Sequence, residues 1–165
     1  MESTATKTTT SRQLLRHAVA TVAYRGGKAV RGAPESFAEF KIGDKPRTPA
    51  QILAHIGDLY DWGLSCLKGK QEWHNSEPLP WPQEVKRFFK TLQALDDYLA
   101  SDAPIAYPAE QIFQGGVADS LTHVGQIAML RRLAGCPMKS ENYFRADIAM
   151  GRVGERQTAP KEEFD

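Results

Sequence analysis

The sequence predicts an all-α protein, an antiparallel four-helix bundle with a short C-terminal helical or irregular segment docked on it. Apolar residues recur at helical spacing in four segments, and none of these segments shows the alternation of a strand. At 165 residues, with 41% hydrophobic and 25% charged residues, the chain suits one globular domain. We expect a disordered N-terminus over residues 1–10, a single helical-bundle domain over 11–155 and a flexible tail over 156–165.

The first expected helix begins at Ser11, whose hydroxyl can cap free backbone amides. Its apolar positions are Leu14, Leu15, Ala18, Val19 and Val22. The pattern weakens at Gly26–Gly27, although residues 28–31 can add a turn. A long connection rich in glycine, proline and charge then covers residues 32–47.

The second helix is expected to start at Thr48 and Pro49, because threonine caps a helix and proline has a suitable fixed φ at the first helical position. Its apolar stripe contains Ile52, Ile56, Leu59, Tyr60, Gly63, Leu64 and Leu67. His55 falls inside this stripe, and Gly69 is the expected stop.

Two further helices follow a loop over residues 70–82. The third has a core face of Val85, Phe88, Phe89, Leu92, Leu95 and Leu99. Residues 101–104 end it, and Pro108 opens the fourth helix, which stops at Gly135. The inward face of the fourth helix is Ile112, Gly116, Asp119, Ser120, His123, Ile127 and Leu130.

The segment after Met138 mixes polar and aromatic residues, so we expect it to dock on the bundle, with one short helix over residues 142–150. If it covers a pocket, Asn142, Asp147 and Arg152 are candidates for substrate contact. The alternative is that these three residues only hold the tail in place.

Composition argues against several classes of partner. The formal net charge is +1, which gives no field that would attract nucleic acid or anionic lipid. We find no apolar run long enough to span a bilayer and no signal-peptide core, so we expect a cytoplasmic protein. Cys66 and Cys136 are far apart and predict neither a disulfide framework nor a thiolate zinc site.

Three ionisable residues fall on these largely apolar stripes: His55, Asp119 and His123. Residues four apart share a helix face, so Asp119 and His123 can present an oxygen and a nitrogen to one point. A facing helix can bring His55 to the same point, which predicts a site for one divalent metal ion. The alternative is a metal-free scaffold in which Asp119 hydrogen-bonds one of the histidines.

Other polar residues near these positions have two interpretations. Gln126 follows His123 by three residues and either orients a ligand or packs between helices. Asp58 and Asp61 either accept hydrogen bonds from ligands or are solvated charges. His74 lies in the tryptophan-rich loop and is expected to be exposed.

The stretches TPAQILAHIGDLYDW and DSLTHVGQIAMLRRLAG resemble the DinB-like superfamily, also called the DinB/YfiT family of metalloenzymes. His55, Asp119, His123 and Gln126 occupy the positions of its hallmark pattern. The resemblance covers roughly residues 11–135 and implies a four-helix bundle, commonly a homodimer, that binds nickel, zinc or iron. It also implies a small-molecule partner such as a low-molecular-weight thiol. Asp119 departs from the pattern, because a histidine is most common there.

The function expected from this resemblance is a metal-dependent enzyme of the thiol-transferase or hydrolase type, with an unidentified substrate and no assigned catalytic residue. Three protein ligands would leave a coordination position open, as in catalytic metal sites. The alternative is a non-catalytic, metal-stabilised, stress-associated binding or scaffold protein.

Overall fold

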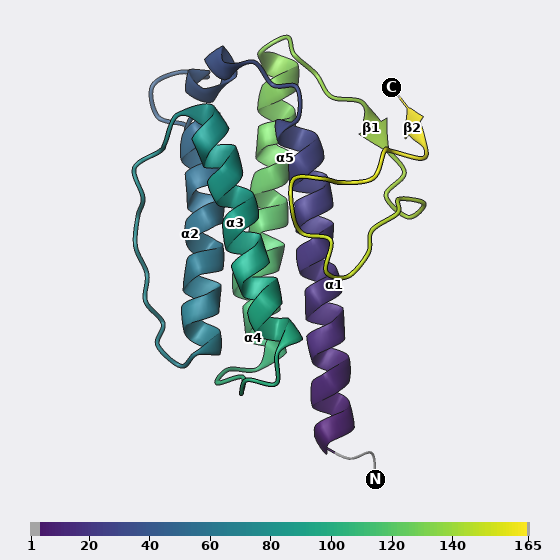
Figure 1. The fold of residues 1–165 in the computed structure, drawn as a ribbon. Coiled ribbons are helices and arrows are strands. Elements are labelled where there is room, and N and C mark those ends of the chain that lie inside the picture. The colour runs from purple at the N-terminus through teal and green to yellow at the C-terminus, as the bar shows by residue number, and fades with distance from the viewer. Residues whose placement is uncertain (1–3, 165) are drawn as a thin grey trace.

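The computed structural model describes residues 4–164, with side chains from residue 10 onward. Four helical rods pack together (Figure 1), formed by α1 (Thr4–Val30), α2 (Pro49–Leu67), α3 (Trp81–Ala100) and a composite rod of α4 (Ala109–Ile112), η2 (Phe113–Val117) and α5 (Ala118–Leu133). A short 3-10 helix, η1 (Glu35–Glu39), lies between α1 and α2. The predicted all-α four-helix bundle is therefore confirmed.

The directions of the helices differ from the purely antiparallel arrangement that the sequence led us to expect. α2 and α3 run parallel, since Arg87 of α3 lies against Gly57 of α2 and Leu95 lies against Gly63. Residues 68–80 return the chain to the starting end of the bundle (Figure 1). An extended stretch of this length can span roughly 40 Å, more than the roughly 30 Å of a 20-residue helix. The long loop thus allows a parallel neighbour.

The fourth rod lies antiparallel to α2 and parallel to α1. Arg131, near the end of α5, donates hydrogen bonds to the carbonyl oxygens of Ala29 at 3.2 Å and Arg31 at 2.7 Å, at the end of α1. The same guanidinium donates to the carbonyl of Cys136 at 2.7 Å. Carbonyls at a helix C-terminus lack partners within the helix, so this buried arginine caps α1 and ties it to α5.

α1 is longer at both ends than the sequence indicated. It begins at Thr4, before the expected cap at Ser11, and residues 1–3 of the expected disordered N-terminus lie outside the described residues. It also continues through Gly26 and Gly27. A Cβ on Gly26 would lie 2.5 Å from Cζ of Phe88, so glycine permits the close approach of α3 at this point.

The predicted start of α2 is confirmed in detail. The Thr48 hydroxyl accepts a hydrogen bond from the Gln51 amide at 3.2 Å, and Oε1 of Gln51 accepts one from the Thr48 amide at 2.9 Å. Pro49 occupies the first helical turn, and Gly69 follows the end of the helix with a φ of 83°. This capping fixes the register of α2 and hence the place of His55.

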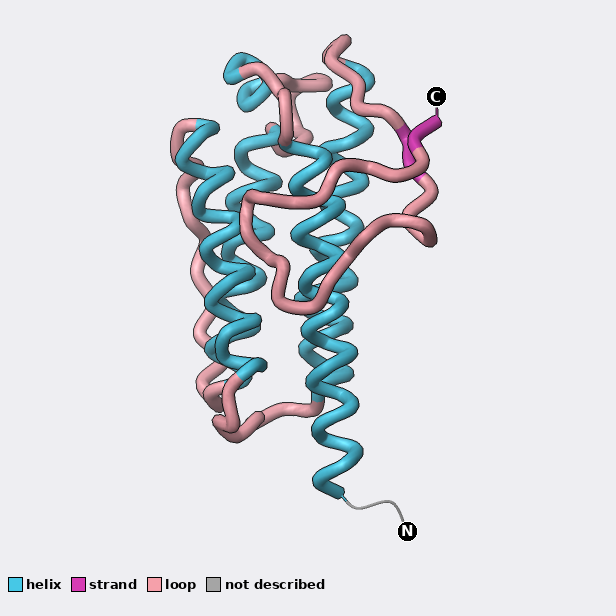
Figure 2. Tube along the Cα trace, turned by 45° about the vertical axis from the view of Figure 1, so that its right-hand side comes forward, coloured by secondary structure: helices cyan, strands magenta, loops and turns pink. Residues whose placement is uncertain are grey.

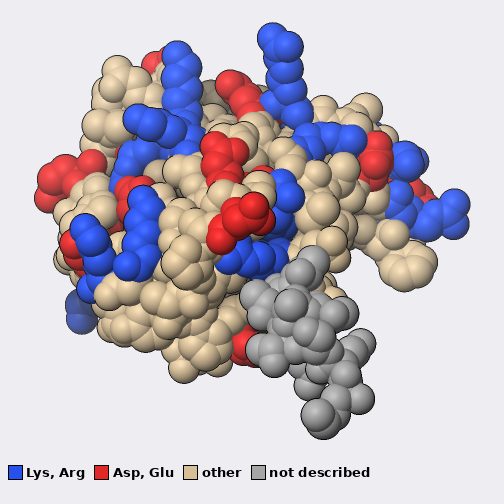
Figure 3. Space-filling view, turned by 60° about the horizontal axis from the view of Figure 1, so that its bottom comes forward, with Lys and Arg blue, Asp and Glu red and all other residues tan. Residues whose placement is uncertain are grey.

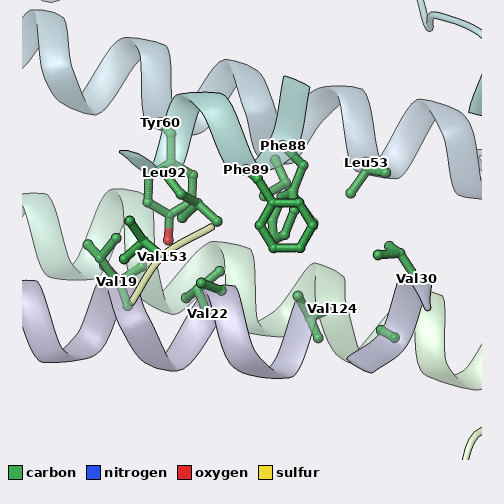
Figure 4. Packing of buried hydrophobic residues seen from close by; sticks show 14 of the residues in the cluster. Val19, Val22, Val30, Leu53, Tyr60, Phe88, Phe89, Leu92, Val124 and Val153 are labelled. Atoms are coloured by element: carbon green, nitrogen blue, oxygen red, sulfur yellow. The ribbon is translucent and has the colours of Figure 1, made fainter. Parts of the chain in front are cut away.

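The core lies between the four rods, and Figure 4 shows Tyr60, Phe88 and Leu92 facing Val19 and Val22 there. Most of the predicted apolar positions are buried. Leu14 is the exception, because 69% of its surface is exposed, whereas the neighbouring Leu15 is buried. The expectation that Leu14 faces the core is therefore wrong.

A π-helical turn, η2, interrupts the fourth rod immediately before the site. The ring of Trp62 on α2 approaches here so closely that a Cβ on Gly115 would lie 2.9 Å from it. The turn ends two residues before Asp119, and the Ser120 hydroxyl donates to the Gly116 carbonyl at 2.7 Å. The inserted residue sets the phase of α5, and such turns are frequent at functional sites.

The chain after α5 docks on α1, as expected, and Figure 2 shows it as a long loop along that helix. The Tyr24 hydroxyl donates to Glu141 at 2.7 Å, and Nζ of Lys28 donates to Glu141 at 2.8 Å and to Glu163 at 2.7 Å. Val153 is fully buried. The antiparallel strands β1 (Ser140–Glu141) and β2 (Glu163–Phe164) pair beside this cluster.

The short helix expected over residues 142–150 is not formed. This segment consists of turns, in which the Arg145 amide donates to the Asn142 carbonyl and the Ala146 amide to the Tyr143 carbonyl. So short a helix has a costly nucleus, and here the chain is held by α1 instead. In the tail over residues 156–165, strand β2 has a hydrogen-bonded partner and Asp165 lies outside the described residues.

The surface is mixed in charge. Figure 3 shows lysines and arginines interspersed with acidic residues on one face, in keeping with the net charge of +1. Within residues 4–164, no helix combines the length and the apolarity that crossing a membrane requires.

Candidate metal centre

The structure brings the three predicted ligands together. His55 lies in the middle of α2, while Asp119 and His123 lie one turn apart on α5. Nε2 of His55 is 3.8 Å from Oδ2 of Asp119, and Nε2 of His123 is 3.6 Å from Oδ1 of the same carboxylate. One atom from each residue lies within 4.8 Å of the other two. Each carboxylate oxygen therefore faces a different imidazole.

These separations bear on the two interpretations of the cluster. Neither distance from Asp119 to a histidine is short enough for a hydrogen bond, which counts against a directly bonded polar cluster. Ligands that lie 2.0–2.2 Å from one tetrahedral ion are about 3.3–3.6 Å from each other. Two imidazole nitrogens and a carboxylate oxygen are suitable donors for a divalent transition metal. These residues could hold a metal ion.

The two histidines are mostly buried, and Asp119 is more accessible. The exposed fractions of the side chains are 17% for His55, 13% for His123 and 44% for Asp119. Burial lowers the pKa of His55 below its ordinary value of 6.5, and the charges of Arg47 and His123 lower it further, against the opposing effect of Asp119. The neutral imidazole is therefore favoured near pH 7, and this is the form that binds a metal.

Gln126 orients one of the two imidazoles. Its Oε1 lies 2.8 Å from Nδ1 of His123, one turn earlier on α5. Because an amide oxygen only accepts hydrogen bonds, this contact places the proton of His123 on Nδ1. The lone pair is then on Nε2, which is the atom that faces Asp119. This contact supports the interpretation in which Gln126 orients a ligand.

Trp73 lies against the other imidazole, a contact that sequence reasoning missed. Its ring centroid is 5.6 Å from that of His55, and the rings of His55 and His123 are 4.7 Å apart. Trp73 belongs to the loop between α2 and α3, which runs beside α2. No periodic pattern in this loop could have placed the tryptophan next to the centre.

A second cluster, Asp58, Asp61 and His74, holds that loop in place. Nε2 of His74 is 3.1 Å from Asp58 and 3.6 Å from Asp61. Arg87 of α3 forms ion pairs with both carboxylates, and the Ser76 amide and hydroxyl donate to Asp58 at 2.8 and 2.7 Å. The carboxylates therefore already have cationic and hydrogen-bonding partners. This cluster is better suited to fixing the loop than to binding a cation.

Hydrogen bonding also controls the ionisation of Asp58. Burial alone would raise the pKa of this carboxyl, but the two hydrogen bonds from Ser76 and the contact with Arg87 outweigh it. The pKa of Asp58 is consequently lower than its ordinary 3.8. Asp58 stays charged at neutral pH although it is buried.

The structure does not bring the predicted tail residues to the centre. Arg152 donates to the Asp147 carbonyl at 2.9 Å and lies 3.5 Å from its carboxylate. The Asn142 amide donates to the carbonyl of Glu162 at 3.0 Å. These contacts hold the docked tail together beside α1, whereas the centre lies between α2 and α5. The observed positions agree with the alternative in which these residues fix the tail.

An open groove of about 730 Å³ begins at the centre and includes both His123 and Gln126 in its wall. The other lining residues are Ile42, Pro46, Arg47, Ile52, Thr122, Gly125, Met129, Leu130 and Leu133. The groove lies between α5 and the connection that precedes α2. It offers a small molecule access to the side of the centre.

Comparison of the chain with protein-family models, with curated proteins and with solved structures finds no match.

Proposed function

We propose that this protein is a DinB-like, metal-dependent enzyme of the thiol-transferase or hydrolase type, in which His55, Asp119 and His123 hold one divalent ion. The observation that supports this proposal is the arrangement of three donor atoms around one point, at separations too long for hydrogen bonds. The resemblance of the sequence around these residues to the DinB-like superfamily also supports it.

The side chains around the donors suit a reactive centre. A bound divalent ion would supply Lewis-acid chemistry and would lower the pKa of a water or thiol at its open position. Gln126 keeps the proton of His123 on Nδ1, and the ring of Trp73 packs against that of His55. Asp119 is half exposed, and His123 lines the groove, so the donor set is open to solvent.

The donor set is compatible with several divalent transition metals. Zinc, nickel and iron all accept two imidazoles, and the carboxylate of Asp119 makes the set harder and more anionic than three histidines would be. Cysteine takes no part, because Cys66 is buried within α2 and Cys136 lies beyond the end of α5. We expect nickel, zinc or iron in the purified protein.

The proposal is tested first by metal analysis of the purified, full-length protein. We expect close to one equivalent of metal in the wild type and a large loss in His55→Ala and in Asp119→Asn. His74→Ala is the matched control, because His74 also contacts aspartates but lies in the second cluster, and it should retain the metal. A wild type without metal after incubation with zinc, nickel or iron would overturn the proposal.

Catalysis is tested separately from binding. The metal-loaded protein should accelerate the transfer or hydrolysis of an activated thiol ester or thiol adduct, and Asp119→Asn should abolish the acceleration. Full metal occupancy without any such activity would favour the alternative, a metal-stabilised binding or scaffold protein.

A further inference from the structure

The groove beside the centre exposes an unusual number of large apolar side chains. Ile42, Met129 and Leu133 are each about half exposed, and all three line it. Exposed apolar side chains are ordinary when they are scattered, but a contiguous group indicates a surface that binds something. The apolar wall indicates that a hydrophobic molecule or part of one binds here.

One cation lies in this apolar wall. Arg47 lines the groove, and among the side chains of residues 10–164 its guanidinium has neither a hydrogen-bonding partner nor an ion pair. The backbone of Arg47 is held in position because Arg47 directly precedes Thr48, the N-cap of α2. A guanidinium without a partner, beside apolar residues, complements a ligand that carries a carboxylate or phosphate.

The helices also set the length of such a ligand. Pro49, the first residue of α2, precedes His55 by six residues, which corresponds to roughly 9 Å along the helix, and Arg47 lies two residues before Pro49. On α5 the groove extends from Thr122 to Leu133, roughly 16 Å, with His123 near its beginning. A molecule whose anionic group pairs with Arg47 can therefore extend along the groove toward His123.

We propose that the groove binds an elongated amphipathic organic anion, whose acidic group pairs with Arg47 and whose apolar body lies on Ile42, Met129 and Leu133. Its other end reaches the donor set at His123. If the protein is the enzyme proposed above, this anion is its class of substrate, and that part of the inference rests on the proposed function. Binding of the anion to the groove does not itself require a metal.

Gly125 allows the groove to be filled without disturbing the core. It lies on α5 in the wall of the groove, and a Cβ placed on it would meet no atom within 4 Å. Gly125→Leu should therefore obstruct the ligand, while Gly125→Ala adds only a methyl group at the same place. Both changes raise helix propensity, so a difference between them reports the obstruction.

The experiment is calorimetric titration of the full-length protein with octanoate, whose length suits the distance from Arg47 to the centre. Octan-1-ol and acetate serve as the uncharged and the short counterparts. We expect octanoate to bind more tightly than either, and Gly125→Leu to prevent its binding while Gly125→Ala retains it. Arg47→Gln should weaken octanoate by up to about five-fold, as loss of an exposed ion pair implies, and leave octan-1-ol unchanged.

Lys45→Gln is the matched control, because Lys45 is exposed in the same connection and does not line the groove. It should bind octanoate as the wild type does. Equal affinity for octanoate and octan-1-ol, or equal weakening by Lys45→Gln and Arg47→Gln, would overturn the proposal.

The metal content of each sample separates this proposal from the proposed function. Octanoate binding that depends on Arg47 and persists in protein without metal supports the groove even if the centre binds no ion. Octanoate binding that requires metal and is unchanged in Arg47→Gln would mean that the carboxylate binds the ion instead of Arg47. That result would overturn the groove proposal but not the proposed function.

Discussion

His123 and Gln126 form a hydrogen bond of 2.8 Å between Nδ1 and Oε1, on the side of the imidazole that faces away from Asp119. The two residues lie one turn apart on α5, so the helix itself holds the pair in register. The imidazole is thereby fixed in both its orientation and its tautomer. The consequences of this arrangement can be measured.

Gln126→Ala should weaken metal binding by about ten-fold or more, because partners that orient a ligating histidine have effects of this size. Competition with a chromophoric chelator measures the affinity. Gln126→Glu should bind metal at least as well as the wild type, since a carboxylate also accepts the proton of Nδ1. Gln111→Ala, an exposed glutamine on α4, is the control. Equal affinities for Gln126→Ala and wild type would contradict the role given to this side chain.

Arg131→Met should lower the free energy of unfolding by about 3 kcal/mol, because three carbonyl oxygens would lose a charged donor in a largely buried place. Chemical denaturation followed by circular dichroism measures this change. The side chain of the neighbouring Arg132 is exposed and makes one hydrogen bond, to Ser140, so Arg132→Met should have a small effect. Similar losses for both variants would show that Arg131 has no special part in capping α1.

Two glycines in helices should respond to alanine in opposite ways. Gly125→Ala should stabilise the protein by about 0.5–1 kcal/mol, since its Cβ meets open space and alanine favours a helix. Gly26→Ala should destabilise it by about 1–3 kcal/mol, because its Cβ would lie 2.5 Å from the buried ring of Phe88. Thermal unfolding of both variants tests the pair. A stabilised Gly26→Ala would show that the contact between α1 and α3 is looser than described.

Asp58 should make the free energy of unfolding depend on pH in the acidic range. Its pKa is lower in the folded protein than its ordinary 3.8, so the unfolded chain takes up the proton first as pH falls. The contribution of Asp58 is therefore complete above about pH 5 and is lost as the pH falls through the folded pKa. Between these limits, the free energy of unfolding of wild type should fall more steeply with acid than that of Asp58→Asn. Asp44→Asn, in the exposed connection, controls for loss of a carboxylate, and identical slopes for wild type and Asp58→Asn would refute the prediction.

Local chemistry explains why much of the fold could be predicted. The cap at Thr48 and Pro49 and the stop at Gly69 depend on neighbouring residues, and both are found in the structure. The parallel packing of α2 and α3 depends instead on the path of residues 68–80, which no periodicity encodes. Leu14 was misplaced because it shares the helical spacing of buried positions, although its side chain lies on the exposed face of α1.

The candidate centre shows the same division. Asp119 and His123 could be paired from their spacing, because one helix positions both. Placing His55 beside them required the assumption that its helix faces theirs. In the structure Nε2 of His55 lies 3.8 Å from Oδ2 of Asp119. The sequence could not predict the positions of Arg47, Trp73 and His74 near these clusters. All three lie in irregular segments, whose course is set by contacts made after the helices pack.

Trp73 makes the centre observable by light. Its indole lies 5.6 Å from the His55 ring, whereas Trp62 packs on Gly115 and Trp81 on Phe37. Ions with partly filled d shells, such as nickel and iron, quench a nearby indole by energy or electron transfer, while zinc with its filled shell does not. The emission of the wild type, corrected with Trp73→Phe, can therefore report both the filling of the centre and the electronic class of the ion, without a substrate.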